Sequence, residues 1–370
     1  MRVDVAIVGG GLSGLYAALL LRGGGCSCVV LEAQERIGGR ILSVTANGPR
    51  LSSVESEARY DLGPAWFWPE FQPRMRSLVG ELGLTVFPQE SEGAVLVERS
   101  LRAPPQRLGR GYNAEPRSMR LVGGMQALVH GLSSRLSADS VQIGVTVTGV
   151  HLASQKQLVR LDAHGKDGSL ELMANAVIVA VPPRLVAASM LFSPELPAEF
   201  RASLAAIPTW MGGHAKFMAI YDRAFWREQG LSGTASSVVG PLVELHDASA
   251  PEGCPALFGF FGLTAAERQV IGLEELQQRS LRQLGRLFGP AAETPLAVFV
   301  ADWAQGPFTS TDADSAAPDG HPRYGLPRGL GTIWNERLAF AGTEMAAEFG
   351  GYLEGALEAA CAAVERIRVT

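Results

Sequence analysis

Three glycines near the start of the chain have a spacing that suits a phosphate ligand. Gly9, Gly11 and Gly14 follow a short apolar stretch, Val3 to Val8, and precede apolar residues with helical periodicity. A strand that turns sharply into a helix at glycines lets a pyrophosphate approach the backbone, where free N–H groups and the helix dipole favour anions. The spacing therefore predicts a dinucleotide site in a strand–turn–helix unit.

The carboxylate of Glu32 strengthens that prediction. Glu32 ends a second predicted strand, CSCVVLE, 18 residues after Gly14. An acidic residue at this place can accept hydrogen bonds from a ribose 2′-hydroxyl, and it disfavours a 2′-phosphate. Together, the glycines and Glu32 predict an adenine dinucleotide.

A lysine with unusual surroundings is the first candidate for chemistry. Lys216 interrupts the apolar run of GGHAKFMAIYDRAFWRE, which we interpret as a strand followed by a helix or turn with Phe225 and Trp226. A buried ammonium is costly unless it is paired or deprotonated, so a lysine here invites a functional explanation. The alternative is a strand lysine whose head reaches solvent, and the residues alone favour that alternative.

A second strand–glycine–helix unit lies near the end of the chain. The apolar stretch LAFAG is followed by GGYLEGALEAA, whose apolar residues share one helical face: Leu353, Leu357, Ala360, Cys361, Val364 and Ile367. A helix that begins near Tyr352 would direct unpaired N–H groups inward and form a second anion site. The alternative is an Ala-rich amphipathic helix that covers a domain, with ordinary turn glycines.

Length and composition limit the classes of protein. A chain of 370 residues exceeds the size of one core, and a net charge of -5 without a basic tract argues against nucleic acid. Four cysteines lack metal spacing, so we expect reduced packing residues in a cytoplasmic protein: Cys26, Cys28, Cys254 and Cys361. The apolar N-terminal stretch lacks the basic start of a signal peptide, and no apolar tail follows, so we expect no membrane anchor.

Further motifs give the chain a family resemblance. After Glu32 comes EAQERIGGRI, and later segments read YDLGPAWFWPE, LVGGMQALVHGL, VQIGVTVTGV, AVIVAVPPRL and LAFAGTE with GGYLEGA. In these segments, which span most of the chain, the sequence resembles the flavin-dependent amine oxidases, a family that includes monoamine and polyamine oxidases. The resemblance implies FAD as the cofactor, rather than NAD, bound in a glutathione-reductase-type fold.

The resemblance also implies which residues contact the cofactor. They are Gly9, Gly11, Ser13, Gly14, Glu32, Ala33, Gly39, Arg40, Gly63, Pro64, Ala65, Val145, Trp303, Gly342, Glu344, Tyr352 and Leu353. Arg40 is expected to fork onto the pyrophosphate, and Val145 to meet adenine. The amide of Leu353 is expected at the N1–C2=O edge of the flavin, where negative charge builds on reduction.

Three residues carry the implied catalytic roles. Lys216 aligns with the family lysine that holds a water at flavin N5, whereas Tyr352 and Phe308 align with two rings that flank the substrate. Such a slot excludes water and can hold an amine lone pair. An isolated loop phenylalanine is usually a packing residue, so Phe308 depends on the alignment alone.

Two departures from the family pattern affect the expectations. Pro307 stands where monoamine oxidases tether FAD through a cysteine, so we expect non-covalent FAD. Only about 60 residues separate the DLG turn from the GGMQAL helix, where familiar family members have a longer, largely helical insertion. We interpret this part of the substrate domain as shortened, which would open or move the substrate entrance.

The expected fold is α/β, with a discontinuous Rossmann-type FAD-binding domain and a smaller sheet-based α+β substrate domain. We assign residues 1–72, 118–205 and 306–370 to the FAD-binding domain, and 73–117 and 206–305 to the substrate domain. The polar, Pro- and Gly-rich segment 309–329 would form a rim or lid.

The expected function is FAD-dependent oxidation of a small-molecule amine. A hydride equivalent would pass to flavin N5, giving an imine and then a carbonyl product, while O2 reoxidises FAD and forms H2O2; another electron acceptor could take the place of O2. One alternative is carbon–carbon desaturation or oxidation of a ring substrate on the same scaffold, and another is a non-catalytic flavin-binding interaction protein. Substrate identity, physiological acceptor and oligomeric state stay open.

Overall fold

The computed structural model describes residues 2–48, 58–110, 116–153, 158–315, 320–328 and 334–367. The helices are α1 (Leu12–Gly23), α2 (Pro73–Glu81), α3 (Gln126–Ser133), α4 (Pro183–Ser189), α5 (Ala198–Ala206), α6 (Phe225–Glu228), α7 (Ala265–Ile271), α8 (Leu273–Phe288) and α9 (Leu353–Arg366). The strands are β1 (Arg2–Val8), β2 (Cys28–Glu32), β3 (Ser43–Val44), β4 (Tyr60–Asp61), β5 (Val86–Pro88), β6 (Ala94–Glu98), β7 (Gln106–Arg110), β8 (Met119–Leu121), β9 (Val141–Ile143), β10 (Thr146–Ala153), β11 (Leu158–Gly165), β12 (Gly168–Val179), β13 (Leu191–Ser193), β14 (Ala215–Ile220), β15 (Leu231–Ser237), β16 (Leu242–Asp247), β17 (Ala256–Phe261), β18 (Ala297–Asp302) and β19 (Leu338–Phe340).

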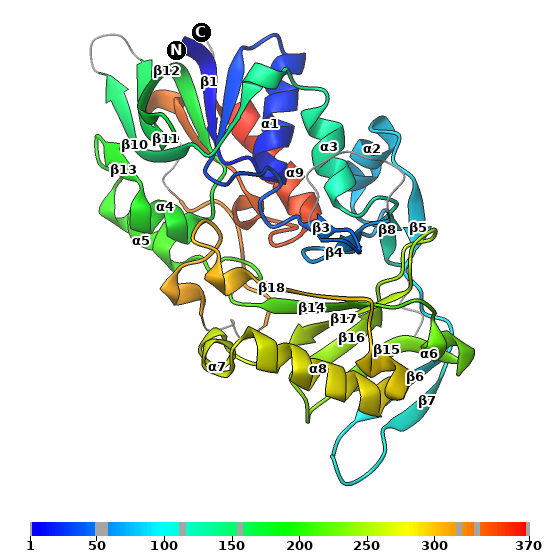
Figure 1. The fold of residues 1–370 in the computed structure, drawn as a ribbon. Coiled ribbons are helices and arrows are strands. Elements are labelled where there is room, and N and C mark those ends of the chain that lie inside the picture. Colours follow the sequence, from blue (N-terminus) through cyan, green and yellow to red (C-terminus); the bar gives the residue numbers. More distant parts are fainter. Residues whose placement is uncertain are drawn as a thin grey trace.

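The larger sheet confirms the α/β fold expected from the sequence. Its strand order is β13-β10-β11-β12-β1-β2-β9, with β19 paired to β12, and β1 runs parallel to both β2 and β12. Alternate residues of β1 enter different cores: Val5 and Ile7 pack with α1, α3 and α9, whereas Ala6 and Val8 pack with the β10–β11 side. The first and last helices, α1 and α9, lie side by side on this sheet (Figure 1).

A second sheet lies in the lower half of Figure 1 and has the order β18-β14-β17-β16-β15-β6-β7. Strand β14, next to the edge strand β18, also alternates. Phe217 and Ala219 pack in a core with residues of α8, whereas Met218 and Ile220 pack with Tyr60 and neighbouring residues. Lys216, which precedes Phe217, therefore lies on the face of β14 that is turned toward the larger sheet.

Helix α2 is fastened to the C-terminal helix. The buried carboxylate of Glu354, in the first turn of α9, accepts hydrogen bonds from the backbone N–H groups of Arg74 (3.0 Å) and Met75 (2.7 Å). These N–H groups belong to the first turn of α2, which otherwise lacks a side-chain cap. Residues of α2 also share a core with α1 and α9, and our division of the chain into domains stays a prediction.

Candidate active site

The first glycine turn has an open cradle. Gly9 has a φ of +104°, and a Cβ built on Gly14 would lie 2.0 Å from the carbonyl oxygen of Gly9, so the fold itself requires both glycines. Gly11 differs, because no atom lies within 4 Å of a Cβ built on it. Its missing side chain therefore leaves space at the N-terminus of α1, and this cradle fits the pyrophosphate expected of FAD.

Glu32 closes the other side of the turn. Its buried carboxylate accepts hydrogen bonds from the N–H groups of Gly10 (2.6 Å) and Gln34 (2.8 Å), and burial raises its pKa. Its carbonyl oxygen accepts the N–H of Val145 at 2.8 Å. The predicted ribose and adenine contacts, Glu32 and Val145, thus lie next to each other, with Ala33 between Glu32 and Gln34.

The second glycine turn brings the two ends of the chain together. The N–H of Gly38 donates to the carbonyl of Gly10 at 2.8 Å, so this turn lies against the first. Arg40 forks onto the buried carboxylate of Glu344, with Nη–Oε distances of 2.6 and 3.0 Å, and donates to the carbonyl of Trp210 at 2.9 Å. In this structure the guanidinium of Arg40 donates two hydrogen bonds to the carboxylate of Glu344. A contact from Arg40 to a pyrophosphate therefore stays a prediction.

Replacing Glu344 with glutamine is expected to lower the free energy of unfolding by about 1–3 kcal/mol, because Arg40 and the N–H of Trp210 lose a charged acceptor in a buried place. The urea midpoint of the FAD-free protein measures the change. Glu348→Gln, an exposed substitution in the same segment, is the matched control. Equal midpoints for the two variants would show that the Arg40–Glu344 pair does not stabilise the fold.

The N-terminus of α9 points its backbone at the same region. The N–H of Gly342 donates to Ser13 Oγ at 3.0 Å, and Thr343 Oγ1 donates to the carbonyl of Tyr352 at 2.7 Å. Tyr352 is the N-cap residue of α9, and no side chain caps this helix end. The first N–H groups of α9, starting at Leu353, are therefore suited to a negatively charged edge of a ligand.

Lys216 is buried, so the alternative of a head that reaches solvent is wrong. Its side chain is 2 % exposed, its Nζ donates to the carbonyl of Gly63 at 3.1 Å, and it lies 3.9 Å from the centre of the Phe258 ring. Within the described residues no carboxylate forms an ion pair with it. The pKa of Lys216 is lowered to about 7, chiefly by burial; the charge of Asp61 acts against this shift and the charge of Arg120 acts with it.

Buried polar atoms without partners surround this lysine. Asp61 uses one carboxylate oxygen to accept from Ser43 Oγ (2.6 Å) and the N–H of Met125 (2.8 Å), whereas its Oδ2 has no partner within the described residues. Nε of the buried Arg120 also has no hydrogen-bond partner within the described residues. Burial raises the pKa of Asp61 and lowers that of Arg120. Unpaired buried groups beside a perturbed lysine are typical of functional sites.

A row of rings forms the edge of the site. His321 stacks on Tyr352, with ring centres 5.4 Å apart and planes at 16°, and its other neighbour is Trp210 at 4.5 Å. Trp68 meets Tyr352 edge-on at 6.2 Å and stacks on Phe71 at 5.9 Å. The ring that faces Tyr352 therefore comes from segment 309–329, which the sequence predicted only as a rim or lid.

The two predicted rings on the β18 side take no part in this row. Phe308 is 41 % exposed and has no ring contact within the described residues. Trp303 is half-buried, and its backbone N–H donates to the carbonyl of His214 at 3.0 Å. The structure brings together most of the other predicted contacts: Gly9, Gly11, Ser13, Gly14, Glu32, Gly39, Arg40, Gly342, Glu344, Tyr352 and Leu353 around the glycine turns, and Gly63 at Lys216, with Pro64 and Ala65 following Gly63 in the chain.

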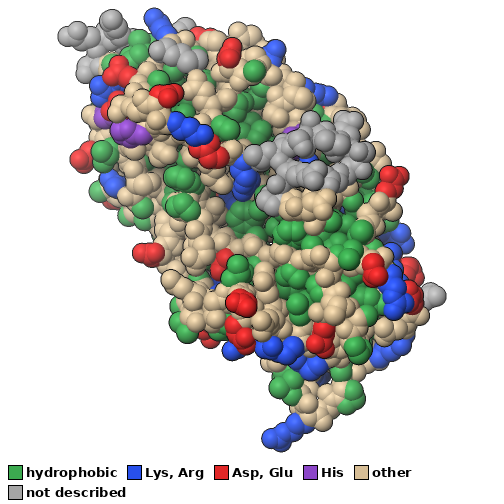
Figure 2. Space-filling view, viewed as in Figure 1, with side chains coloured by type: hydrophobic (Ala, Val, Ile, Leu, Met, Phe, Trp, Pro, Cys, Tyr) green, Lys and Arg blue, Asp and Glu red, His purple; other side chains and the backbone are tan. Residues whose placement is uncertain are grey.

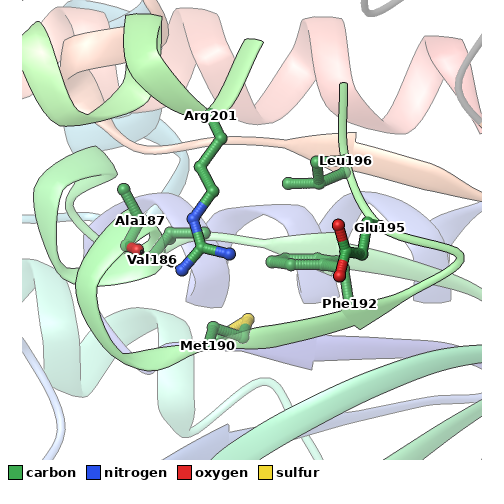
Figure 3. Close-up of a pocket in the computed structure, with 7 residues that line it drawn as sticks. All are labelled: Val186, Ala187, Met190, Phe192, Glu195, Leu196 and Arg201. Atoms are coloured by element: carbon green, nitrogen blue, oxygen red, sulfur yellow. Dashed lines mark hydrogen bonds between the residues drawn. The ribbon is translucent and has the colours of Figure 1, made fainter. Parts of the chain in front are cut away.

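One small pocket lies away from these groups. It is lined by residues of α4, α5 and the segment between them (Figure 3). The face drawn in Figure 2 shows instead that apolar side chains gather at the waist between the two sheets, where the predicted site lies. Among the described residues no group of His, Cys, Asp or Glu could hold a metal ion.

Comparison with known families fits this geometry. Residues 106–368, most of the chain, match the family described as flavin containing amine oxidoreductase. The chain belongs to this amine oxidase family. Residues 7–82 of this flavin amine oxidase also match the NAD(P)-binding Rossmann-like domain, which contains the first glycine turn.

The flavin amine oxidase is similar to curated and solved proteins over nearly its whole length. It is 24 % identical to the "Probable flavin-containing monoamine oxidase A" of Dictyostelium discoideum, over 96 % of this chain and 95 % of the relative. It is 26 % identical to the flavin-containing amine oxidase of Oncorhynchus mykiss, over 96 % and 84 %. Its fold matches putrescine oxidase bound to putrescine with a TM-score of 0.79 at 23 % identity, over 99 % of this chain and 98 % of the other.

Membership in the family makes the chain an FAD-dependent oxidoreductase that acts on amines. The cofactor is FAD, and Pro307 offers no thiol for a covalent bond to it. The alignment with the Dictyostelium relative spans 458 residues, more than this chain has, so the relative contains segments without a counterpart here. Within the described ranges, no helix has both the length and the apolar character needed to span a bilayer.

Proposed function

We propose that this flavin amine oxidase oxidises a small-molecule amine at the carbon atom bonded to nitrogen. When bound, FAD supplies N5 as the acceptor of the hydride equivalent and passes the electron pair to O2, which leaves as H2O2. The imine product then hydrolyses to a carbonyl compound. The observation that carries the proposal is Lys216, a buried lysine that donates to the carbonyl of Gly63 and faces the predicted flavin turn.

Lys216 acts through its remaining hydrogen-bonding capacity. Its ammonium has three N–H groups and the structure uses one of them on Gly63. Because its pKa is lowered to about 7, the group is largely neutral in slightly alkaline solution and does not repel a cationic substrate there. It can therefore hold a water molecule and accept or return a proton within the site.

The remaining groups would bind FAD and orient the amine. Gly11 and the N-terminus of α1 would hold the pyrophosphate, and the uncapped N-terminus of α9 would face the part of the ring that becomes negative. The ring row of Trp210, His321, Tyr352 and Trp68 would line the substrate face. An apolar, ring-lined slot favours the neutral amine over the ammonium, which supplies the lone pair that oxidation requires.

Anaerobic mixing with a panel of primary amines, secondary amines, polyamines and amino acids is expected to bleach the flavin absorbance with at least one class. Admission of air should then restore the colour and release H2O2, which a peroxidase-coupled dye detects. A desaturase-type substrate without nitrogen serves as the negative control. Protein that binds FAD but is bleached by no amine would refute the amine assignment.

A further inference from the structure

Described residues before and after His321 are hydrogen-bonded to distant parts of the chain. Asp314 accepts hydrogen bonds from the N–H of Thr209 (2.9 Å) and from Nη1 of Arg184 (2.6 Å). Farther along, the hydroxyl of Tyr324 donates to the carbonyl of Pro208 at 3.1 Å, and the N–H of Gly325 donates to the carbonyl of Glu344 at 3.1 Å. These long-range bonds hold His321 over Tyr352.

The hydrogen bonds of His321 define which ring nitrogen is available. Its Nδ1 lies 3.0 Å from the carbonyl oxygen of Pro322. Since a carbonyl can only accept, Nδ1 carries the hydrogen, and Nε2 of the neutral ring is an acceptor with a lone pair. A Cβ built on Gly351 would lie 3.0 Å from this Nε2, so the glycine leaves that nitrogen uncovered.

The groups around the imidazole come from several parts of the chain. The titratable groups packed against it are Tyr352 and Tyr324, and the Arg40–Glu344 ion pair lies behind Trp210. The two members of that pair carry opposite charges, and His321 itself is exposed to solvent. Proton transfer is a common role of imidazole in enzymes, and an exposed ring can pass a proton to water.

We propose that His321 is a catalytic residue that accepts the proton a substrate ammonium must lose before oxidation. The proton moves from the substrate nitrogen to Nε2, which leaves a neutral amine and an imidazolium, and no electrons are transferred in this step. His321 stacked on Tyr352 leaves no room for an alkyl chain between the rings, which needs about 8 Å. The amine therefore lies at the edge of the pair, beside Nε2 and Gly351. This inference rests on the proposed function.

The test compares His321→Phe, which keeps a ring for stacking and removes the proton acceptor, with wild-type holoprotein. Flavin content should be unchanged. With the best amine of the panel, anaerobic flavin reduction by the variant is expected to be roughly 100-fold slower at pH 7. The difference should shrink to a few-fold near pH 10, where the free amine is abundant in solution. His164→Phe, at an exposed position on β11, is the control.

A second readout does not depend on turnover. The ligand is an amine without hydrogen on its α-carbon, which can bind but cannot be oxidised. Calorimetry in buffers of different ionisation enthalpy gives the number of protons that the complex releases when this amine binds. At pH 7 we expect wild-type protein to release fewer protons per bound amine than His321→Phe, because the imidazole of the wild-type protein keeps part of the proton that the substrate loses. Wild-type protein that no amine reduces would overturn both proposals. A variant that matches an active wild-type protein in rate and proton count would overturn only the role of His321.

Discussion

Replacing Gly11 with valine is expected to give a folded protein that purifies without FAD. A Cβ built at this position lies within 4 Å of no described atom beyond its chain neighbours, and the backbone φ of -73° suits any residue, so the fold should tolerate a side chain here. The valine would instead occupy the cradle in front of α1, where the pyrophosphate must approach. We expect FAD affinity to fall roughly 100-fold or more, a loss of about 3 kcal/mol in binding free energy. The ratio of flavin to protein absorbance and a titration with FAD measure it.

The matched control is Gly23→Ala, at the far end of the same helix, where a Cβ also meets nothing. This variant should bind FAD like the wild type, and both variants should keep the thermal midpoint of the FAD-free protein. A yellow Gly11→Val protein with the wild-type flavin ratio would place the cofactor elsewhere. Gly14→Ala is not a usable control, because its Cβ would lie 2.0 Å from a backbone oxygen.

Replacing Lys216 with methionine is expected to slow catalysis and to stabilise the FAD-free fold. Loss of the one buried amine beside Gly63 should slow flavin reduction or reoxidation on the order of 100-fold. Methionine fills a similar volume without the cost of burying charge, so the free energy of unfolding should rise. Stopped-flow absorbance measures the two half-reactions, and urea denaturation measures the stability.

The pH dependence of that stabilisation has a definite sign. The pKa of Lys216 falls from its ordinary value of 10.5 in the unfolded chain to about 7 in the fold. Between these values the unfolded chain binds more protons, so wild-type stability rises with pH, by up to about 1.4 kcal/mol per pH unit. The advantage of the methionine variant should thus be largest below pH 7 and shrink toward pH 10.5. Lys166→Met, at a side chain 74 % exposed, should show no such trend, and a pH-independent difference for Lys216→Met would contradict the lowered pKa.

Periodicity and local chemistry made much of this fold predictable. The glycine spacing, Glu32 and the two strand–turn–helix units can be recognised because their residues are close together in sequence. Alternation along β14 likewise puts Lys216 and Phe217 on opposite faces of the sheet. The strand expected around Lys216 is present as β14. The same local signals gave Tyr352 as the start of a helix, which the structure shows as the N-cap of α9.

The ring opposite Tyr352 could not be found in that way. Segment 309–329 has no periodicity, and the place of its side chains depends on bonds such as those from Asp314 to Arg184, 130 residues away. Alignment suggested Phe308, whereas the structure puts His321 against Tyr352 and leaves Phe308 without a ring partner among the described residues. The ion pair between Arg40 and Glu344, which are 304 residues apart, could not be predicted from local sequence either. The only sequence signal for His321 was a histidine in a Pro- and Gly-rich loop.

The bond from Glu354 to the start of α2 has a consequence for biosynthesis. The backbone groups of Arg74 and Met75 leave the ribosome about 280 residues before the carboxylate that satisfies them. Helix α9 also supplies the surface against which α1 packs. The part of the chain that contains α1 and α2 therefore cannot complete its packing before α9 has been synthesised, so a nascent chain must keep the apolar faces of these helices exposed until then.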